Sequence, residues 1–110
     1  MQIREISLKE LDIVYDIIKE LYIDLSYKKF EDLIYDMRDM NYQMFGIFER
    51  EKLITYAGLA VQTTLMDERH LKVFDFITSN RFDNSYNNIM KEYIADYAKV
   101  AMCKKVKYEN

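Results

Sequence analysis

The sequence predicts one mixed α/β domain over residues 1–110, of the α+β kind, with the element order β-α-α-β-β-β-α-β. Two apolar stretches with helical spacing follow a short alternating segment, and three stretches rich in aromatic and β-branched residues come next. A last amphipathic stretch precedes a short strand-like end. No linker, repeat or low-complexity segment divides the chain, and its length allows one hydrophobic core. We therefore expect a mixed sheet of about five strands covered by helices.

The first strand and the first helix are joined by the sharpest local signal in the chain. QIREI alternates apolar and polar residues, and Ser7 with Glu10 has the spacing of a capping box at a helix start. Ser26 is predicted to cap a second helix. The apolar face of the first helix consists of Leu11, Val14, Ile18, Leu21 and Leu25. That of the second consists of Phe30, Leu33, Ile34, Met37 and Met40.

The hydrophobic period changes at Asn41 from that of a helix to that of strands. Residues 42–49 and 53–64 flank the charged turn EREK, which predicts a β-hairpin. Residues 70–78 are apolar on nearly both faces and are predicted to form a central strand covered on both sides. After a polar break, the spacing predicts a last helix that ends near Met102. Its apolar stripe is Ile89, Tyr93, Ile94, Tyr97, Ala98 and Ala101, and CKKVKY then predicts a closing strand.

Composition excludes several classes of function. The net charge of -3, with acidic and basic residues mixed along the chain, argues against a nucleic-acid partner. No apolar run approaches the ~20 residues that span a bilayer, and the N-terminus lacks the apolar core of a signal peptide. We therefore expect a cytoplasmic protein without a membrane partner. One cysteine and one histidine predict neither an internal disulfide nor a metal site.

Two stretches, together with the order of elements, resemble the GNAT superfamily of acetyl-CoA-dependent N-acetyltransferases. LITYAGLAVQTTLMDERHLKVFDFIT, residues 53–78, is similar to the family's third and fourth strands, with the pair Ala57 and Gly58 and an acid at Asp75. MKEYIADYAKVAMCKKV, residues 90–106, is similar to the helix and strand that follow the cofactor loop. The resemblance implies that acetyl-CoA lies where the fourth and fifth strands splay apart, and that acetyl passes to a small amine or a protein amine.

The resemblance also implies a cofactor site around the loop that precedes the last helix. The family's loop, Arg/Gln-x-x-Gly-x-Gly/Ala, offers backbone N–H groups to the pyrophosphate at a helix N-terminus. In the nearest register Arg81 takes the first position, but both glycines are absent, since Gly46 and Gly58 lie in the hairpin. Asp83 would repel an anion if it points inward, and Tyr86 is expected to obstruct it. The cofactor contacts implied in this way are Ile77, Arg81, Asn84, Ser85, Tyr86 and Asn87.

Three single residues have a catalytic and a structural interpretation. The resemblance implies that Asp75 takes the proton of the acceptor amine, and the alternative is a carboxylate satisfied by the backbone or by a tyrosine. His70 is either a base or a half-exposed structural residue. Cys103 is either an acyl-carrying nucleophile or a small core residue. The residues alone leave these alternatives open.

The end of the chain bears on both function and assembly. Members of the family continue past the fifth strand with a helix and two strands, whereas this sequence stops at Asn110, which is expected at the end of the last strand. An uncovered sheet edge is then expected, and a homodimer would cover it. Three functions stay open at this point: an N-acetyltransferase, a non-catalytic binding module with the same fold, and a structural subunit of a larger assembly.

Overall fold

The computed structural model describes residues 1–109, so Asn110 lies outside the described residues. It confirms the predicted fold class and element order. The strands form one sheet in the order β1-β2-β3-β4-β5, antiparallel except for the parallel pair β4 and β5. The elements are β1 (Gln2–Ile6), α1 (Leu11–Ile18), α2 (Tyr27–Met37), β2 (Gln43–Glu49), β3 (Lys52–Thr64), β4 (Glu68–Thr78), α3 (Ser85–Val100) and β5 (Val106–Tyr108), with 3₁₀ turns at Leu8–Glu10 and Arg38–Met40.

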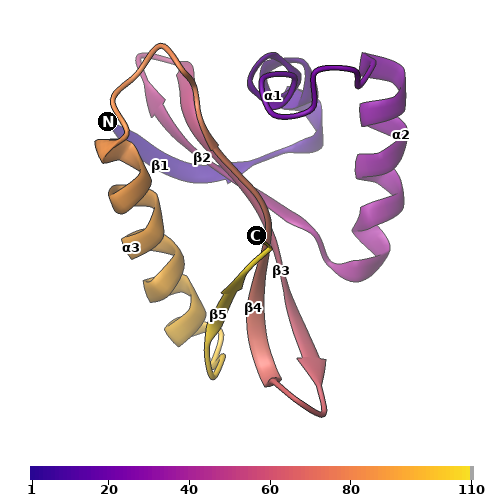
Figure 1. The fold of residues 1–110 in the computed structure, drawn as a ribbon, viewed down its shortest axis with the longest axis vertical. Helices are drawn as coiled ribbons and strands as arrows, with labels where there is room; N and C mark the ends of the chain where they lie inside the picture. The colour runs from indigo at the N-terminus through magenta and orange to yellow at the C-terminus, as the bar shows by residue number, and fades with distance from the viewer. Residues whose placement is uncertain (110) are drawn as a thin grey trace.

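The sheet separates two hydrophobic cores. Helices α1 and α2 cover one face and α3 covers the other (Figure 1). The core under α1 and α2 includes Val14, Phe30 and the fully buried ring of Tyr56. The core under α3 includes Leu71 and Ile94. No helix formed by residues 1–109 has the length and apolarity needed to cross a membrane.

The capping box at the start of the helical segment forms as the sequence predicts. The Ser7 side chain accepts a hydrogen bond from the backbone, and Glu10 Oε1 accepts one from the Ser7 N–H at 3.0 Å. Arg4 on β1 donates to both carboxylate oxygens of Glu10, at 3.1 and 2.7 Å. The hydrogen bonds from Arg4, and after them the one from the Ser7 backbone, lower the pKa of Glu10 to about 2. This bidentate pair fastens β1 to the first helical turn.

Glu10→Gln is expected to lower the free energy of unfolding by about 1 kcal/mol at neutral pH, since the cap and the ion pair both weaken. The folded-state pKa of about 2 lies below the ordinary 4.5, so the stabilisation is complete above pH 4.5 and is lost as the pH falls toward 2. Urea unfolding at pH 7 and pH 3 should therefore show the gap between wild type and variant shrinking in acid. Glu5→Gln, at an exposed position on the same strand, is the control. A gap of constant size at both pH values would contradict the assignment.

The first helix is shorter than predicted. It ends at Ile18, and Leu21, expected on its apolar face, is 42% exposed. Tertiary contacts account for this, because the segment after α1 makes hydrogen bonds to the residues that follow β4. Glu20 accepts hydrogen bonds from the Ser79 hydroxyl and the Asn80 N–H at 3.0 and 2.9 Å. The segment therefore crosses toward the end of β4 instead of continuing as a helix.

The second helix and the hairpin agree with the sequence prediction in most respects. Ser26 caps α2 by accepting a hydrogen bond from the Lys29 N–H at 3.2 Å. Leu33 is the exception, because it is 40% exposed and not in the core. The hairpin turns through Arg50 and Glu51, whose φ angles are 51° and 70°. Two successive left-handed residues give the turn the twist that a two-residue hairpin needs.

A bulge in β4 reverses the faces of the sheet on which its side chains lie, so that residues before and after the bulge no longer alternate in step. Its pairing with β3 shifts by one residue, so that Gly58 pairs with Asp75 and Leu59 with Val73, and Phe74 between them has no partner. Val73 packs in the core under α3, whereas Ile77 packs in the core under α1 and α2. A regular strand would keep Val73, Asp75 and Ile77 on one face. The bulge at Phe74 therefore turns Asp75 toward α1 and α2.

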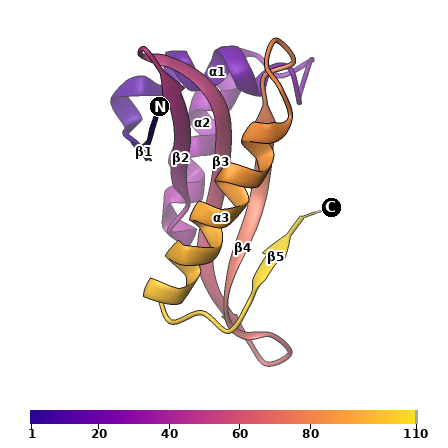
Figure 2. The ribbon, with the colours of Figure 1, turned by 90° about the vertical axis from the view of Figure 1, so that its left-hand side faces the viewer.

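The fourth strand is paired along only part of its outer edge. Strand β5 pairs only with residues 71–73, and among the described residues no strand lies beside 74–78 on that side. Side chains 74–78 are accordingly only half-buried. Both faces of the strand are covered as predicted, because Val73 packs in the core under α3 and Ile77 in the core under α1 and α2. The closing strand is also shorter than the predicted CKKVKY, because only Val106–Tyr108 is regular. Strand β5 is therefore short beside the long strand β4 (Figure 2). The self-association expected from an uncovered edge stays a prediction.

Candidate functional site

Two tyrosines hold the carboxylate of Asp75, and a third extends the network. Tyr22 donates a hydrogen bond to Oδ1 at 2.5 Å, and Tyr42 donates one to Oδ2 at 2.6 Å. The hydroxyls of Tyr42 and Tyr56 lie 2.8 Å apart. The structure thus shows the tyrosine contact that was one of the two interpretations of Asp75. A carboxylate has about four acceptor positions, so each oxygen keeps room for a further donor.

Asp75 lies at the wall of a cavity of about 250 Å³ between the sheet and helices α1 and α2. We call this cavity the tyrosine–aspartate pocket. Among residues 1–109, Asp75 is the only charged one that lines it, and all the others are apolar or aromatic. They are Ile18, Tyr22, Leu25, Phe30, Leu33, Ile34, Met37, Tyr42 and Tyr56. Such a pocket suits an apolar ligand with one group that can bond to a carboxylate.

The tyrosines of the network are hydrogen-bond donors at neutral pH. Burial, and then the hydrogen bond to Asp75, raises the pKa of Tyr22 to about 12. Burial also raises the pKa of Tyr42 and of Tyr56 above that of a free phenol. The hydroxyls of Tyr22 and Tyr42 therefore stay protonated and keep the Asp75 carboxylate in one orientation.

Gly58 makes the space that the network needs. A Cβ atom at this position would lie 1.6 Å from the Tyr42 hydroxyl oxygen and 2.2 Å from Cζ of the same ring. The Tyr42 ring therefore passes directly over the backbone of β3 to reach Asp75. This contact gives a physical reason for the glycine that the resemblance had singled out.

A second hollow, of about 440 Å³, runs where β4 and β5 separate. We call it the β4–β5 groove. Tyr22 lines both the groove and the tyrosine–aspartate pocket, so its ring stands where the two meet. The other groove residues come mainly from β4, α3 and the end of the chain: Leu21, Val73, Phe74, Phe76, Asn87, Lys91, Tyr108 and Glu109. A ligand in the groove would contact Tyr22, which donates a hydrogen bond to Asp75.

The first turn of α3 already uses its own N–H groups. Asp83 Oδ1 accepts from the Ser85 N–H at 2.7 Å, and the Asp83 carbonyl accepts from the Tyr86 N–H at 3.3 Å. The Asn84 carbonyl accepts from the Asn87 N–H at 2.9 Å. A helix N-terminus favours an anion, and here the carboxylate of Asp83 takes that position. The two glycines of the loop pattern are absent from this turn, as the sequence shows.

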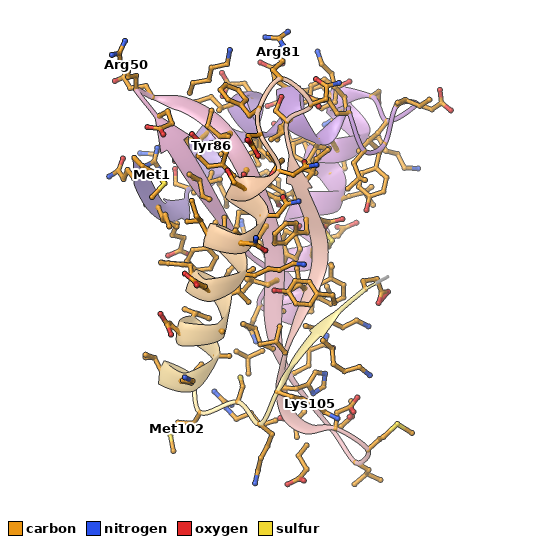
Figure 3. All side chains as sticks on the ribbon, turned by 60° about the vertical axis from the view of Figure 1, so that its left-hand side comes forward. Met1, Arg50, Arg81, Tyr86, Met102 and Lys105 are labelled. Carbon is orange, nitrogen blue, oxygen red and sulfur yellow. The ribbon has the colours of Figure 1, made fainter. Side chains whose placement is uncertain are left out.

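The residues that the resemblance implied as cofactor contacts do not lie together in the structure. Asn87 lines the groove and accepts a hydrogen bond from the Thr78 hydroxyl at 2.5 Å. Ile77 packs in the core under α1 and α2. Arg81 is exposed at the end of the molecule that also carries Arg50 (Figure 3), where both line a different hollow beside α1.

The remaining implied contacts lie at the start of α3. Asn84 and Ser85 are exposed there, with the Ser85 N–H held by Asp83. Tyr86 donates from its hydroxyl to Glu49 Oε2 at 2.9 Å and packs in the core under α3. Its ring is therefore directed toward the end of β2, and the expectation that it obstructs a phosphate stays a prediction.

The two other reactive side chains take structural positions. His70 is 2% exposed and its Nδ1 lies 2.9 Å from the Glu68 carbonyl oxygen, so the expectation of a half-exposed histidine is wrong. Cys103 packs beside the core under α3, and burial raises the pKa of its thiol. A protonated thiol is a poor nucleophile. Within residues 1–109 no three His, Cys, Asp or Glu side chains gather closely enough to hold a metal ion.

The tyrosines of the site were not predicted from the sequence. Tyr22 lies 53 residues from Asp75 and Tyr42 lies 33 residues from it. Separations this large form no local sequence motif, and nothing in the sequence marks these two among the ten tyrosines of the chain. The one usable signal is the glycine at position 58, because a glycine inside a strand indicates the close approach of another group.

Comparison with known proteins establishes the fold. No protein-family model matches the sequence, and no curated protein matches it. Solved structures match over nearly the whole chain. A GNAT family acetyltransferase from Staphylococcus aureus has a TM-score of 0.84 at 11% identity, covering 99% of this chain and 85% of its own.

Two further neighbours carry specific names. The ribosomal-protein-alanine N-acetyltransferase of Brucella melitensis biovar Abortus has a TM-score of 0.81 at 12% identity, covering 97% of this chain and 77% of its own. Glucosamine-6-phosphate N-acetyltransferase of Arabidopsis thaliana has a TM-score of 0.77 at 14% identity, covering 99% and 82%. The chain therefore has the fold of the GNAT acetyltransferases.

Proposed function

We propose that this chain is a GNAT-type N-acetyltransferase whose acceptor amine enters the tyrosine–aspartate pocket. One observation carries the proposal: the pocket and the β4–β5 groove meet at Tyr22, beside the bulge that turns Asp75 into the pocket. Transfer between two bound molecules needs two adjoining sites with a reactive group where they meet. The solved acetyltransferases of the same fold support the reaction class.

In this proposal Asp75 is the group that acts on the amine. Its carboxylate would bind the amine nitrogen and accept the proton that the nitrogen loses. The C–N bond would form as the C–S bond of the donor breaks, and the released thiolate would take a proton from water. Tyr22 and Tyr42 fix the carboxylate, so it is oriented before the amine arrives. The other pocket residues are apolar or aromatic, so Asp75 offers the charge to which the amine binds.

Acetyl-CoA, which would supply the acetyl group, fits only part of this site. The groove is lined by the aromatic rings of Phe74, Phe76 and Tyr108, which suits its narrow arm. The start of α3 does not fit its pyrophosphate, because Asp83 both occupies the Ser85 N–H and adds a negative charge there. The groove alone would then hold the donor, and we expect weak binding.

Asp83→Gly is expected to tighten acetyl-CoA binding about tenfold. A like charge at ~4 Å costs about 4 kcal/mol at an effective dielectric of 20, and solvent screening at this exposed residue reduces that figure to the order of 1 kcal/mol. Calorimetric titration of wild type, Asp83→Gly and Asp83→Asn measures the change. Asp96→Asn, an exposed acid farther along α3, is the matched control. If none of these proteins binds acetyl-CoA at millimolar concentration, the acetyl-donor part of the proposal is wrong.

The arrangement at Asp83 favours a second candidate, a binding module that takes the amine without acetylating it. The N–H groups of Ser85, Tyr86 and Asn87 already donate to Asp83 and Asn84, so this helix start offers fewer free donors to a bound anion. Incubation with acetyl-CoA and a panel of amines, followed by mass spectrometry of the amines, separates the two candidates. Acetylated product supports the transferase. Amine binding without product at any acetyl-CoA concentration supports the binding module.

A further inference from the structure

We propose that the ligand of the tyrosine–aspartate pocket is a small hydrophobic primary amine with a single positive charge, such as a medium-chain alkylamine or an arylalkylamine. The inference rests on the proposed function for its assignment of the pocket to the amine. It goes further by naming the chemical class of that amine from the residues that line the pocket.

The charge of the ligand follows from the single acid in the pocket. In the described part of the chain Asp75 is the only charged lining residue, and its two oxygens accept one hydrogen bond each, from Tyr22 and from Tyr42. A primary ammonium carries three donors on one compact charge, so it bonds to the acceptor positions that are left. The rings of the three lining tyrosines offer π-faces of the kind that attract a cation. A ligand carboxylate would be repelled at the same place.

The rest of the ligand is apolar because the rest of the pocket is. Six of the lining residues are aliphatic, thioether or phenyl side chains without a hydrogen-bonding group other than the sulfur: Ile18, Leu25, Phe30, Leu33, Ile34 and Met37. A second ammonium or a ring of hydroxyls would lose its water there without gaining a partner. This excludes diamines, polyamines and amino sugars.

The size of the pocket limits the length of the amine. A cavity of about 250 Å³ holds about eight non-hydrogen atoms if each takes roughly the 30 Å³ of a water molecule. Hexylamine and phenethylamine are of this size. The rim residues Tyr22 and Leu33, 44% and 40% exposed, are mainly apolar and offer few partners for the backbone of a peptide. A free amine therefore fits better than a lysine side chain of a protein.

Binding of amines to the full chain, measured by calorimetry without any acetyl donor, tests the inference. Each added methylene is expected to tighten binding about fourfold, so hexylamine should bind about tenfold or more tighter than butylamine. Hexanol should bind at least tenfold more weakly than hexylamine. 1,4-Diaminobutane, glucosamine and an Nα-acetyl-lysine amide should not bind measurably. Equal binding of the diamine and hexylamine, a lack of dependence on chain length, or lysine amide binding as tight as that of hexylamine would overturn the inference.

Two variants test separately how the charge of Asp75 and the apolar wall of the pocket contribute to amine binding. Asp75→Asn should remove the preference for hexylamine over hexanol. Leu33→Asp, at the half-exposed rim, should weaken hexylamine at least tenfold and admit the diamine. Tyr35→Asp is the control, because Tyr35 is 47% exposed on the same helix and does not line the pocket. Hexylamine binding that Leu33→Asp leaves unchanged would place the amine elsewhere and reject the inference.

The outcomes for the inference and for the proposed function are distinguishable. Amine binding with the predicted selectivity, but without acetylated product, would reject the transferase and leave the amine class standing. Acetylation of diamines or amino sugars in preference to hexylamine would support the transferase and reject the amine class.

Discussion

Gly58→Ala is expected to lower the free energy of unfolding by about 3 kcal/mol or more, the upper range for overpacking a core. The added methyl group would lie 1.6 Å from the Tyr42 hydroxyl oxygen and 2.2 Å from Cζ. Moving Tyr42 aside would break the hydrogen bonds of its hydroxyl with Asp75 and Tyr56. It would also disturb the packing of its ring against Phe74, whose centroid lies 6.1 Å away. Urea unfolding followed by circular dichroism measures the loss.

A double-mutant cycle tests whether the Tyr42 ring is the cause. Tyr42→Ala alone is expected to destabilise the fold, but in that background Gly58→Ala should cost less than about 1 kcal/mol. Gly46→Ala gives a contrast, because its Cβ would meet the flexible ends of Leu53 and Ile6 at 2.5 and 2.9 Å. Its cost should be smaller. If Gly58→Ala is as stable as wild type, the close passage of the ring over β3 is not as described.

The parts of the fold that could be predicted are those specified locally. The Ser7 and Glu10 pair and the turn at Arg50 each involve residues that are neighbours in the chain, and both form where expected. The end of α1 could not be predicted, because helical spacing continues to Leu25 in the sequence. Glu20 and Tyr22 end that pattern by bonding to residues more than fifty positions away. Tertiary contacts of this kind override local propensity.

The orientation of Asp75 shows why a site can be predicted by residue but not by geometry. Val73, Asp75 and Ile77 alternate as though they shared one face of a regular strand. The extra residue at Phe74, visible only in the pairing with β3, moves Asp75 and Ile77 to the opposite face. Ile77 thereby becomes a core residue and Asp75 enters the pocket. A one-residue bulge leaves no mark in the sequence pattern.

For the loop before α3, the sequence showed which residues it contains but not what their side chains contact. The absence of glycine can be read from the sequence, whereas the direction of each side chain depends on the backbone. Asp83 turns back on the Ser85 N–H, and Tyr86 turns away to Glu49. Asp83 thereby places its carboxylate at the helix start, whereas Tyr86 places its hydroxyl at the end of β2.

Asp75→Asn is expected to lower the rate of amine acetylation by about a hundredfold or more, the range for loss of a general base. The substitution keeps the shape of the side chain, and its amide can still accept from one tyrosine and donate to the other. Stability should therefore change little. Acetyl-CoA binding should also change little, since Asp75 does not line the groove. The rate at saturating amine and acetyl-CoA, with both ligand affinities measured separately, isolates the effect.

A matched variant distinguishes a group that takes the proton from one that positions it. Tyr56 touches the network only through the hydroxyl of Tyr42, so Tyr56→Phe should lower the rate by less than about tenfold and leave its pH profile unchanged. Asp75→Asn should instead lower the rate about a hundredfold or more while the affinity for acetyl-CoA stays unchanged. If Asp75→Asn keeps the wild-type rate, the proton leaves by another route. Asp75 would then be a binding residue for the ammonium and not the base.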